Sequence, residues 1–237
     1  MKKLILALAI ATSALSAMPA QATVLVPGSQ LQPTQAIPAG TEGTQQAVTS
    51  GPALALTFSA IFNQAVYRNS GGTLDFYYQV IRTGAGSVSS EEIRSFTVSN
   101  FAGYTVDAFT RGGDFDGAGP FVAPNNPTLS DGTPSGSTTT FGRSLSGAVL
   151  TTEFGLNGLT GTENSTTYVF RTNATQFDLL GTYGIIDGST ASGLAYRPIG
   201  APAVPEPSTW AFMLVGFGAI GYSMRSRRAG YRMAQAV

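Results

Sequence analysis

The segment Leu74-Asp75-Phe76-Tyr77-Tyr78-Gln79-Val80-Ile81 has the clearest two-residue periodicity in the chain. Its first, third, fifth and seventh residues are apolar or aromatic, and successive side chains of a strand point to opposite faces. Turn-forming residues stand on both sides, Asn69-Ser70-Gly71-Gly72 before the segment and Gly84-Ala85-Gly86-Ser87 after it. We therefore expect a strand that buries one face and is bounded by two turns.

Short strand-favouring segments follow one another through most of the chain, without an amphipathic helical period between them. Residues 111–136, rich in Gly and Pro, are expected to form a loop. This pattern predicts an all-β fold, a single antiparallel β-sandwich or jelly-roll-like domain over residues 51–200. Residues 23–50 are expected to be an extended lead-in that is at most partly ordered. The remaining strands are expected at 53–62, 96–98, 104–108, 138–150, 151–156, 165–172 and 182–186.

Charge and composition exclude several classes of function. Residues 23–200 hold twelve of the thirteen acidic residues, seven arginines and no lysine, so this region has a net charge of −5 and offers no basic stripe for nucleic acid. The chain has no His, which removes the commonest general base, serine-type triads and the usual zinc ligands. It has no Cys either, so its stability depends on its core or its contacts rather than on disulfides.

The N-terminus has the three parts of a secretory signal peptide. Met1-Lys2-Lys3 is a basic start, 4–15 is apolar, and Ala20-Gln21-Ala22 is a cleavage site of the A-x-A type. We expect residues 1–22 to be removed after Ala22 by signal peptidase, following export through the general secretion machinery. The segment is not expected to be a membrane anchor.

The C-terminus has four features in a fixed order. In the linker 201–207, Pro205 and Pro207 flank Glu206 and stiffen an extended strip that a partner can bind at little entropic cost. Residues 208–224 are expected to form an apolar membrane-spanning helix about 26 Å long, with Trp210 at one interface. The basic residues that follow stop the span and place the tail 225–237 in the cytoplasm by the positive-inside rule. These residues are Arg225, Arg227 and Arg228.

A glycine pattern inside this apolar run matches the dinucleotide-binding fingerprint G-x-G-x-x-G, at Gly216, Gly218 and Gly221. That fingerprint requires a preceding strand and an acidic residue about 20 positions further on. Neither is present, so no nucleotide cofactor is expected. Small residues here instead allow close packing within a membrane.

At these residues the chain resembles bacterial proteins that carry a PEP-CTERM sorting signal, in the variant with Trp-Ala after the motif. The matching positions are Pro205, Glu206, Pro207, Trp210 and Ala211, followed by the Gly-rich span and the Arg cluster. The resemblance implies recognition and processing by an exosortase, an integral-membrane peptidase or transpeptidase. It also implies an exported protein of bacteria that make exopolysaccharide or biofilm matrix.

Other candidate sites each have a plainer structural interpretation. Asp114 and Asp116, with Asp131, could supply oxygen ligands for calcium, or could form local turns in a solvated loop. Glu91-Glu92 could act as catalytic carboxylates, but neighbouring strand residues point to opposite faces and cannot flank one glycosidic bond. A row of tyrosines could stack on sugar rings or fill the core. These are Tyr77, Tyr78, Tyr104 and Tyr168.

Together these features predict a non-enzymatic exported protein with a structural or adhesive role at the cell surface or in the extracellular matrix, without a cofactor. It would pass through an inner-membrane intermediate on the way. The alternative is a carbohydrate-binding module for matrix polysaccharide. A third interpretation, a carboxylate-dependent hydrolase, requires two facing acidic groups in a cleft.

Overall fold

A computed structural model describes residues 23–33, 36–37, 42–111, 120–123, 125, 139–154, 158–200, 213–215 and 217. The chain forms two compact units, Met1–Ala201 and Pro202–Val237. The expected signal peptide, residues 1–22, lies outside the described residues.

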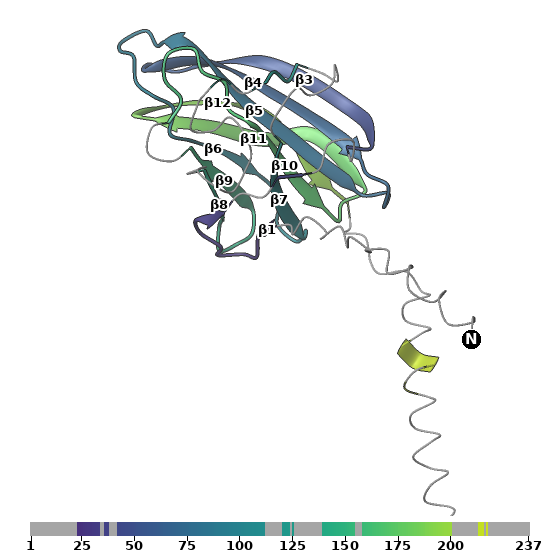
Figure 1. Cartoon of the computed structure of the whole chain (residues 1–237). Helices are drawn as coiled ribbons and strands as arrows, with labels where there is room; N and C mark the ends of the chain where they lie inside the picture. The colour runs from purple at the N-terminus through teal and green to yellow at the C-terminus, as the bar shows by residue number, and fades with distance from the viewer. Residues whose placement is uncertain are drawn as a thin grey trace, which may run out of the picture. The chain divides into compact units, whose positions relative to one another are not determined.

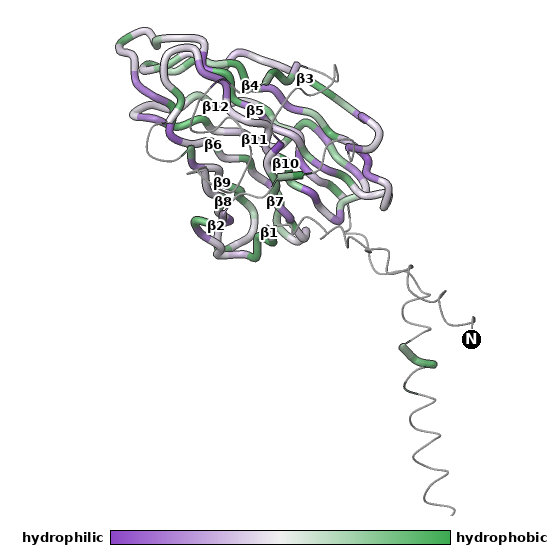
Figure 2. Tube along the Cα trace, viewed as in Figure 1, coloured by the Kyte–Doolittle hydropathy of each residue, from purple (hydrophilic) through white to green (hydrophobic). Residues whose placement is uncertain are grey.

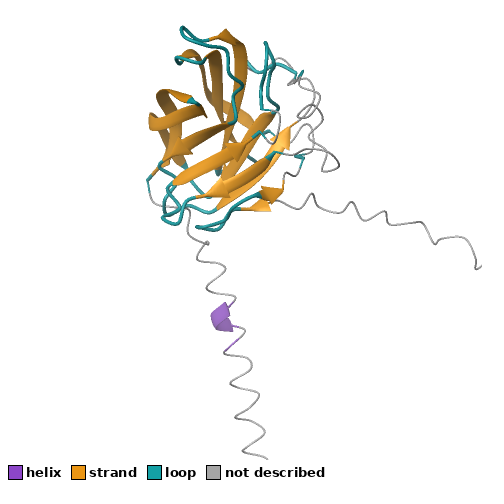
Figure 3. Cartoon of the chain, turned by 90° about the vertical axis from the view of Figure 1, so that its left-hand side faces the viewer, coloured by secondary structure: helices purple, strands orange, loops and turns teal. Residues whose placement is uncertain are grey.

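The first unit is an antiparallel β-sandwich, as the sequence predicts, and its strands form two layers (Figures 1 and 3). Each sheet has six strands. The first sheet has the order β1 (Thr23–Val24), β7 (Val106–Arg111), β10 (Thr167–Thr172), β5 (Leu74–Ala85), β4 (Phe58–Arg68), β3 (Thr44–Leu54). The second has the order β12 (Ser189–Ile199), β11 (Gln176–Asp187), β6 (Ser95–Ser99), β9 (Val149–Glu153), β8 (Thr140–Arg143), β2 (Gln32–Pro33).

The alternating segment that begins at Leu74 forms β5, near the centre of the first sheet between β4 and β10. Its even-numbered residues Phe76, Tyr78 and Val80 are completely buried between the sheets. Its odd-numbered residues face the other side of the first sheet, which is also covered. This accounts for the near-continuous burial of a strand that was expected to bury only one face.

The core between the sheets is rich in aromatic rings. Phe62 stacks on Tyr183 with ring centroids 4.1 Å apart, and Phe96 lies 5.4 Å from the ring of Tyr168. Burying one such side chain contributes roughly 1.5–3 kcal/mol. Since the chain has no Cys, this core stabilises the sandwich without disulfides.

The outer face of the first sheet carries a second, smaller apolar cluster, built from Ala65, Tyr67, Tyr77, Phe109 and Val169 under Ile37 and Phe121. The connection 120–123 is held there by side-chain amides. Gln79 donates to the Val122 carbonyl at 2.6 Å and accepts from the Val122 N–H at 3.0 Å. Asn63 donates to the Pro120 carbonyl at 2.7 Å. The expected loop 111–136 thus covers part of the sheet where it is described.

Three expected boundaries differ from the structure, and each involves backbone pairing that side-chain patterns do not report. Strand β3 runs through the expected junction at residues 50 and 51, because its polar half pairs with β4 (Thr49 opposite Gln64). The expected strand 53–62 is interrupted by a tight turn at 55–57, where Thr57 donates to the Asp187 carbonyl at 2.8 Å. The expected pair 138–150 and 151–156 reverses direction earlier, at 144–148.

Strand β12 was not expected at all, because Gly193 and Pro198 break its pattern. It pairs with β11 along its length and lies at the edge of the second sheet. The edge of β12 that faces away from β11 is covered by side chains of the first sheet. Gln64 donates to the Leu194 carbonyl at 2.9 Å, and the Tyr78 hydroxyl donates to the Tyr196 carbonyl at 2.7 Å.

The pairing register defines two ends of the sandwich. One end contains Gly200, the last described residue of the sandwich, and is called here the exit end. It holds the turns 26–29, 69–73, 100–105, 144–148 and 173–176. The opposite, far end holds the connections 55–57, 86–94, 158–166 and 187–189. β1 and β8 lie close together at the exit end, at the lower side of the sandwich in Figure 1, where Gly28 N–H donates to the Arg143 carbonyl at 3.1 Å.

Candidate functional site

The four tyrosines proposed as a sugar-stacking row do not form one. Tyr77, Tyr78 and Tyr168 are fully buried and Tyr104 is 9% exposed. Tyr78 and Tyr168 face the core between the sheets, whereas Tyr77 lies in the outer cluster. Burial raises the pKa of the Tyr78 hydroxyl well above its ordinary value. The sugar-stacking expectation is therefore wrong for these residues. Both faces of the sheet that carries Tyr77, Tyr78 and Tyr168 are covered, and Tyr104 is buried in the turn before β7.

Glu91 and Glu92 lie in the connection before β6 rather than in a strand. The Glu91 N–H donates to the Thr57 carbonyl at 2.8 Å, and Glu92 forms an ion pair with the half-exposed Arg94. Arg82 is 2% exposed and donates to the Glu91 carbonyl from Nη2 at 2.8 Å, which holds this connection onto β5. The two carboxylates therefore belong to a far-end connection anchored by its backbone.

A third far-end carboxylate, Asp187, is partly buried at the end of β11, and its Oδ2 has no hydrogen-bond partner among the described residues. Burial, with the nearby charges of Glu92 and Glu91, raises its pKa above the ordinary value. No group of three or more potential metal-ligating side chains occurs within the described ranges. The calcium candidates Asp114, Asp116 and Asp131 lie outside those ranges.

A row of charged residues crosses the outer face of the first sheet near the exit end. Arg171 in β10 donates to both oxygens of the fully buried Asp75 in β5. Its Nε lies 3.2 Å from Oδ1 and 3.0 Å from Oδ2, and its Nη2 lies 2.9 Å from Oδ2. Asn69 donates a further bond to Asp75 at 2.8 Å. On the other side of Arg171 lies Asp107 in β7, whose pKa is raised by burial. Arg171 separates the two carboxylates, so they do not have the facing arrangement of a glycosidase pair.

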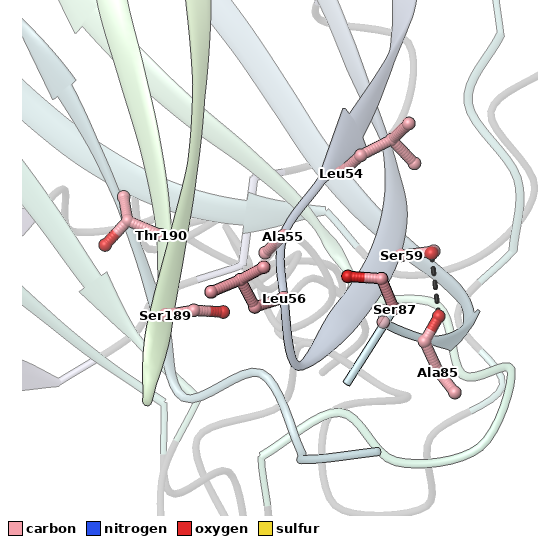
Figure 4. Close-up of a pocket in the computed structure, with 9 residues that line it drawn as sticks. Leu54, Ala55, Leu56, Ser59, Ala85, Ser87, Ser189 and Thr190 are labelled. Atoms are coloured by element: carbon pink, nitrogen blue, oxygen red, sulfur yellow. Dashed lines mark hydrogen bonds between the residues drawn. The ribbon is translucent and has the colours of Figure 1, made fainter. Parts of the chain in front are cut away.

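The far end also has an open pocket of about 690 Å³. It lies between the β3–β4 turn, the end of β5 and the β11–β12 turn, as Figure 4 shows. Ser59 uses its hydroxyl to bind the Ala85 carbonyl at 2.8 Å, and Ser189 is hydrogen-bonded to Thr57. Leu54 and Leu56 are exposed beside it, at 70% and 59%. Sequence patterns did not indicate this pocket, because its residues come from two hairpin turns and the end of β5, which are separate segments of the chain.

In the second unit, Met213–Val215 and Phe217 are helical. Their side chains are between 49% and 72% exposed, and Figure 2 shows this piece as hydrophobic. A helix that is apolar on every side is typical of a membrane span or a deeply buried core. Within the described part of the chain, no helix has the length and apolar character needed to cross a membrane. Most of the expected span 208–224 lies outside that part, so the span stays a prediction.

Residues 203–228 match the model of the PEP-CTERM protein-sorting motif. The chain carries a PEP-CTERM sorting signal. No curated protein and no solved structure matches the chain. The PEP-CTERM match therefore identifies the signal, whereas the sandwich is described by its own structure.

The matched PEP-CTERM region contains every sorting residue that the sequence predicted, from Pro205 to Ala211, and ends at Arg228, the last arginine of the expected stop. The signal implies an exported protein that is processed by an exosortase and delivered to the cell envelope or surface. The motif residues lie outside the described ranges, and so do Ala20 and Ala22 of the expected signal-peptide cleavage site.

Proposed function

We propose that this protein is a non-enzymatic structural or adhesive component of the cell surface or extracellular matrix, associated with exopolysaccharide. A signal peptide directs it to the general secretion machinery and signal peptidase. The C-terminal span then holds it in the inner membrane until an exosortase acts near Pro205-Glu206-Pro207. The observation that carries the proposal is the PEP-CTERM signal at 203–228 joined to an all-β first unit.

The architecture of the sandwich supports a structural role. Its aromatic residues are used in two packed clusters, and its buried acid Asp75 is neutralised by Arg171. Its buried arginines Arg82 and Arg143 bind backbone carbonyls of connections at opposite ends. These groups hold the connections onto the sheets, which suits a domain that must stay folded outside the cell without disulfides.

The sorting part of the proposal is tested by intact-mass analysis of membrane, surface and medium fractions. Wild-type protein is expected to lose the tail and leave the membrane fraction. The Pro205→Ala/Pro207→Ala variant is expected to keep the tail and stay in the membrane, because the stiff recognition strip is gone. Pro202→Ala, just outside the matched region, is the control and should behave as wild type. A double variant with wild-type mass and location would refute the sorting role.

A second candidate function is carbohydrate binding, now based on the far-end pocket rather than on the tyrosines. The pocket presents the hydroxyls of Ser87 and Thr190 beside exposed leucines, which suits a neutral glycan. The test is co-sedimentation of the protein with exopolysaccharide from its own cells. Ser87→Val/Thr190→Val should reduce binding several-fold, and Ser146→Val, an exposed serine at the exit end, should not. Equal binding by all three proteins would reject the pocket.

A further inference from the structure

The exit end of the sandwich differs from the far end in charge. The exit-end turns 26–29, 69–73, 100–105, 144–148 and 173–176 contain no charged residue, nor do residues 199–200. The far-end connections contain one cation, Arg94, and the four carboxylates of Glu91, Glu92, Glu163 and Asp187. Since the sandwich as a whole is acidic, the absence of carboxylates from the exit-end turns sets this end apart. The charge that lies against the turns is basic, because Arg68 donates to the Gly72 carbonyl at 2.6 Å and to the Thr175 carbonyl at 3.1 Å.

The exit end also exposes apolar side chains. Leu145, in the β8–β9 turn, is 89% exposed, and Val26 and Leu31, in the segment between β1 and β2, are 59% and 65% exposed. The two elements are in contact, because Gly28 N–H donates to the Arg143 and Ser144 carbonyls, each at 3.1 Å. We call Val26, Leu31 and Leu145 the exit-end patch. Exposed apolar patches of this kind mark contacts with proteins or membranes.

Short hydrogen bonds connect the patch to the point where the first unit ends. The Tyr104 hydroxyl donates to the Gly200 carbonyl. Arg143 in turn donates to the Tyr104 carbonyl at 2.8 Å and to the Leu25 carbonyl at 2.7 Å. Arg143 is 5% exposed and burial lowers its pKa, but the group stays charged because its ordinary pKa is so high. The patch and Gly200 therefore belong to one hydrogen-bonded end of the sandwich.

The sorting motif follows closely in the chain. Only residues 201–207 separate Gly200 from the start of the expected membrane span. A fully extended linker of that length reaches about 25 Å at most. An apolar end whose turns carry no carboxylate can rest on lipid within this reach, whereas carboxylates are repelled by anionic headgroups.

We infer that the exit-end patch is a lipid-contact surface, which seats the sandwich on the bilayer while the protein awaits sorting. This inference rests on the proposed membrane-bound intermediate. The exit-end patch contacts the lipid headgroup region, into which Val26 and Leu145 insert. The far-end pocket and carboxylates then face away from the membrane.

The absence of Cys from the chain allows a direct test in the full-length protein. Ser146→Cys at the exit end and Ser87→Cys at the far end place a fluorophore at two exposed positions. The labelled protein is reconstituted in vesicles of phosphatidylethanolamine and phosphatidylglycerol that contain lipids with a shallow nitroxide quencher. Quenching is expected to be several-fold stronger at position 146 than at position 87. Equally weak quenching at both positions, as for a label fully exposed to water, would overturn the inference.

Charge variants test whether the patch itself makes the contact. Val26→Glu/Leu145→Glu, with the label at position 146, should lose most of the quenching. Leu54→Glu, at a far-end leucine whose 70% exposure lies between those of Val26 and Leu145, should leave the quenching unchanged. Unchanged quenching in the double variant would refute the lipid contact. Quenching that falls as the protein is diluted in lipid would also refute it, because that result indicates a second copy of the protein on the patch. Release of the full chain by alkaline carbonate would instead overturn the membrane intermediate, and the inference with it.

Discussion

Gln64 in the first sheet accepts a hydrogen bond from the backbone N–H of Tyr196, in the edge strand of the second sheet, at 2.7 Å. The same amide donates to the Leu194 carbonyl at 2.9 Å. One side chain thus supplies a donor and an acceptor that a neighbouring strand would supply to β12. It joins the two sheets and protects an edge at which other chains could pair.

Replacing this amide should therefore be costly. Gln64→Leu leaves a buried N–H and a partly buried carbonyl without this partner, and an unpaired buried group costs about 1–3 kcal/mol. We expect the free energy of unfolding to fall by about 2–5 kcal/mol, measured by urea denaturation of the exported protein. Gln46→Ala, an exposed amide in β3, is the control and should change stability by less than about 0.5 kcal/mol. A Gln64→Leu protein as stable as the control would contradict this role.

Arg143 should hold the exit end together. It donates to the carbonyls of Leu25, Phe101, Tyr104 and Gly147, at distances of 2.7–3.0 Å. Arg143→Met removes these donors, and we expect it to speed hydrogen exchange in the turns 100–105 and 144–148 while the far end stays protected. Arg143→Lys should be intermediate, because an ammonium group cannot reach as many carbonyls in one plane. Arg94→Met, at a half-exposed arginine, provides the comparison. Equal protection of these turns from hydrogen exchange in all variants would contradict this role of Arg143.

The Asp75–Arg171 pair gives a third prediction. Arg171→Met leaves the completely buried Asp75 carboxylate without its cation, and removing one member of a buried ion pair costs about 3–5 kcal/mol. Asn69 retains its bond to Asp75 and should moderate the loss. The double variant Asp75→Asn/Arg171→Met should recover much of the stability, since no buried charge remains. Thermal unfolding of the three proteins tests this, and a double variant less stable than Arg171→Met would argue against it.

The two aspartates of β11 should respond to pH with opposite signs. Burial raises the pKa of Asp187 in the folded protein, so its charged form costs stability at neutral pH, and that cost disappears as the pH falls and the carboxyl is protonated. We expect Asp187→Asn to raise Tm at pH 7, with a gain that shrinks towards pH 4.

Asp178 is the matched control for this experiment. Its hydrogen bond from Arg197 lowers its pKa, so its charged form stabilises the fold above the unfolded-state pKa, and this contribution is lost as the pH falls through the folded-state pKa. Asp178→Asn should lower Tm slightly at pH 7, because the pair is partly exposed. Tm shifts of the same sign for both variants at pH 7 would refute the opposite pKa directions of Asp187 and Asp178.

Local signals were enough to predict the fold class and the sorting signal. The alternation around Phe76 and Tyr78 reports a strand because period and burial are properties of consecutive residues. The expected strand 165–172 is close to β10, Thr167–Thr172, for the same reason. The sorting motif was readable because a short linear peptide, with its prolines and arginines in order, is itself the signal.

Features that depend on distant residues were decided only by the tertiary structure. Strand β12 exists because β11 and Gln64 supply its backbone partners, and Gln64 lies more than 120 positions away in the chain. The sequence alone did not decide whether the tyrosines are exposed or buried. Packing between the two sheets buries Tyr78 and Tyr168, and the covered outer face of the first sheet buries Tyr77. The carboxylate-free exit-end turns likewise come together from five separate segments of the chain. Local patterns in the chain indicate most of the strands, because period and burial are read from consecutive residues. Backbone partners, burial of both faces and surface charge depend on which segments meet, and that is a property of the packed molecule.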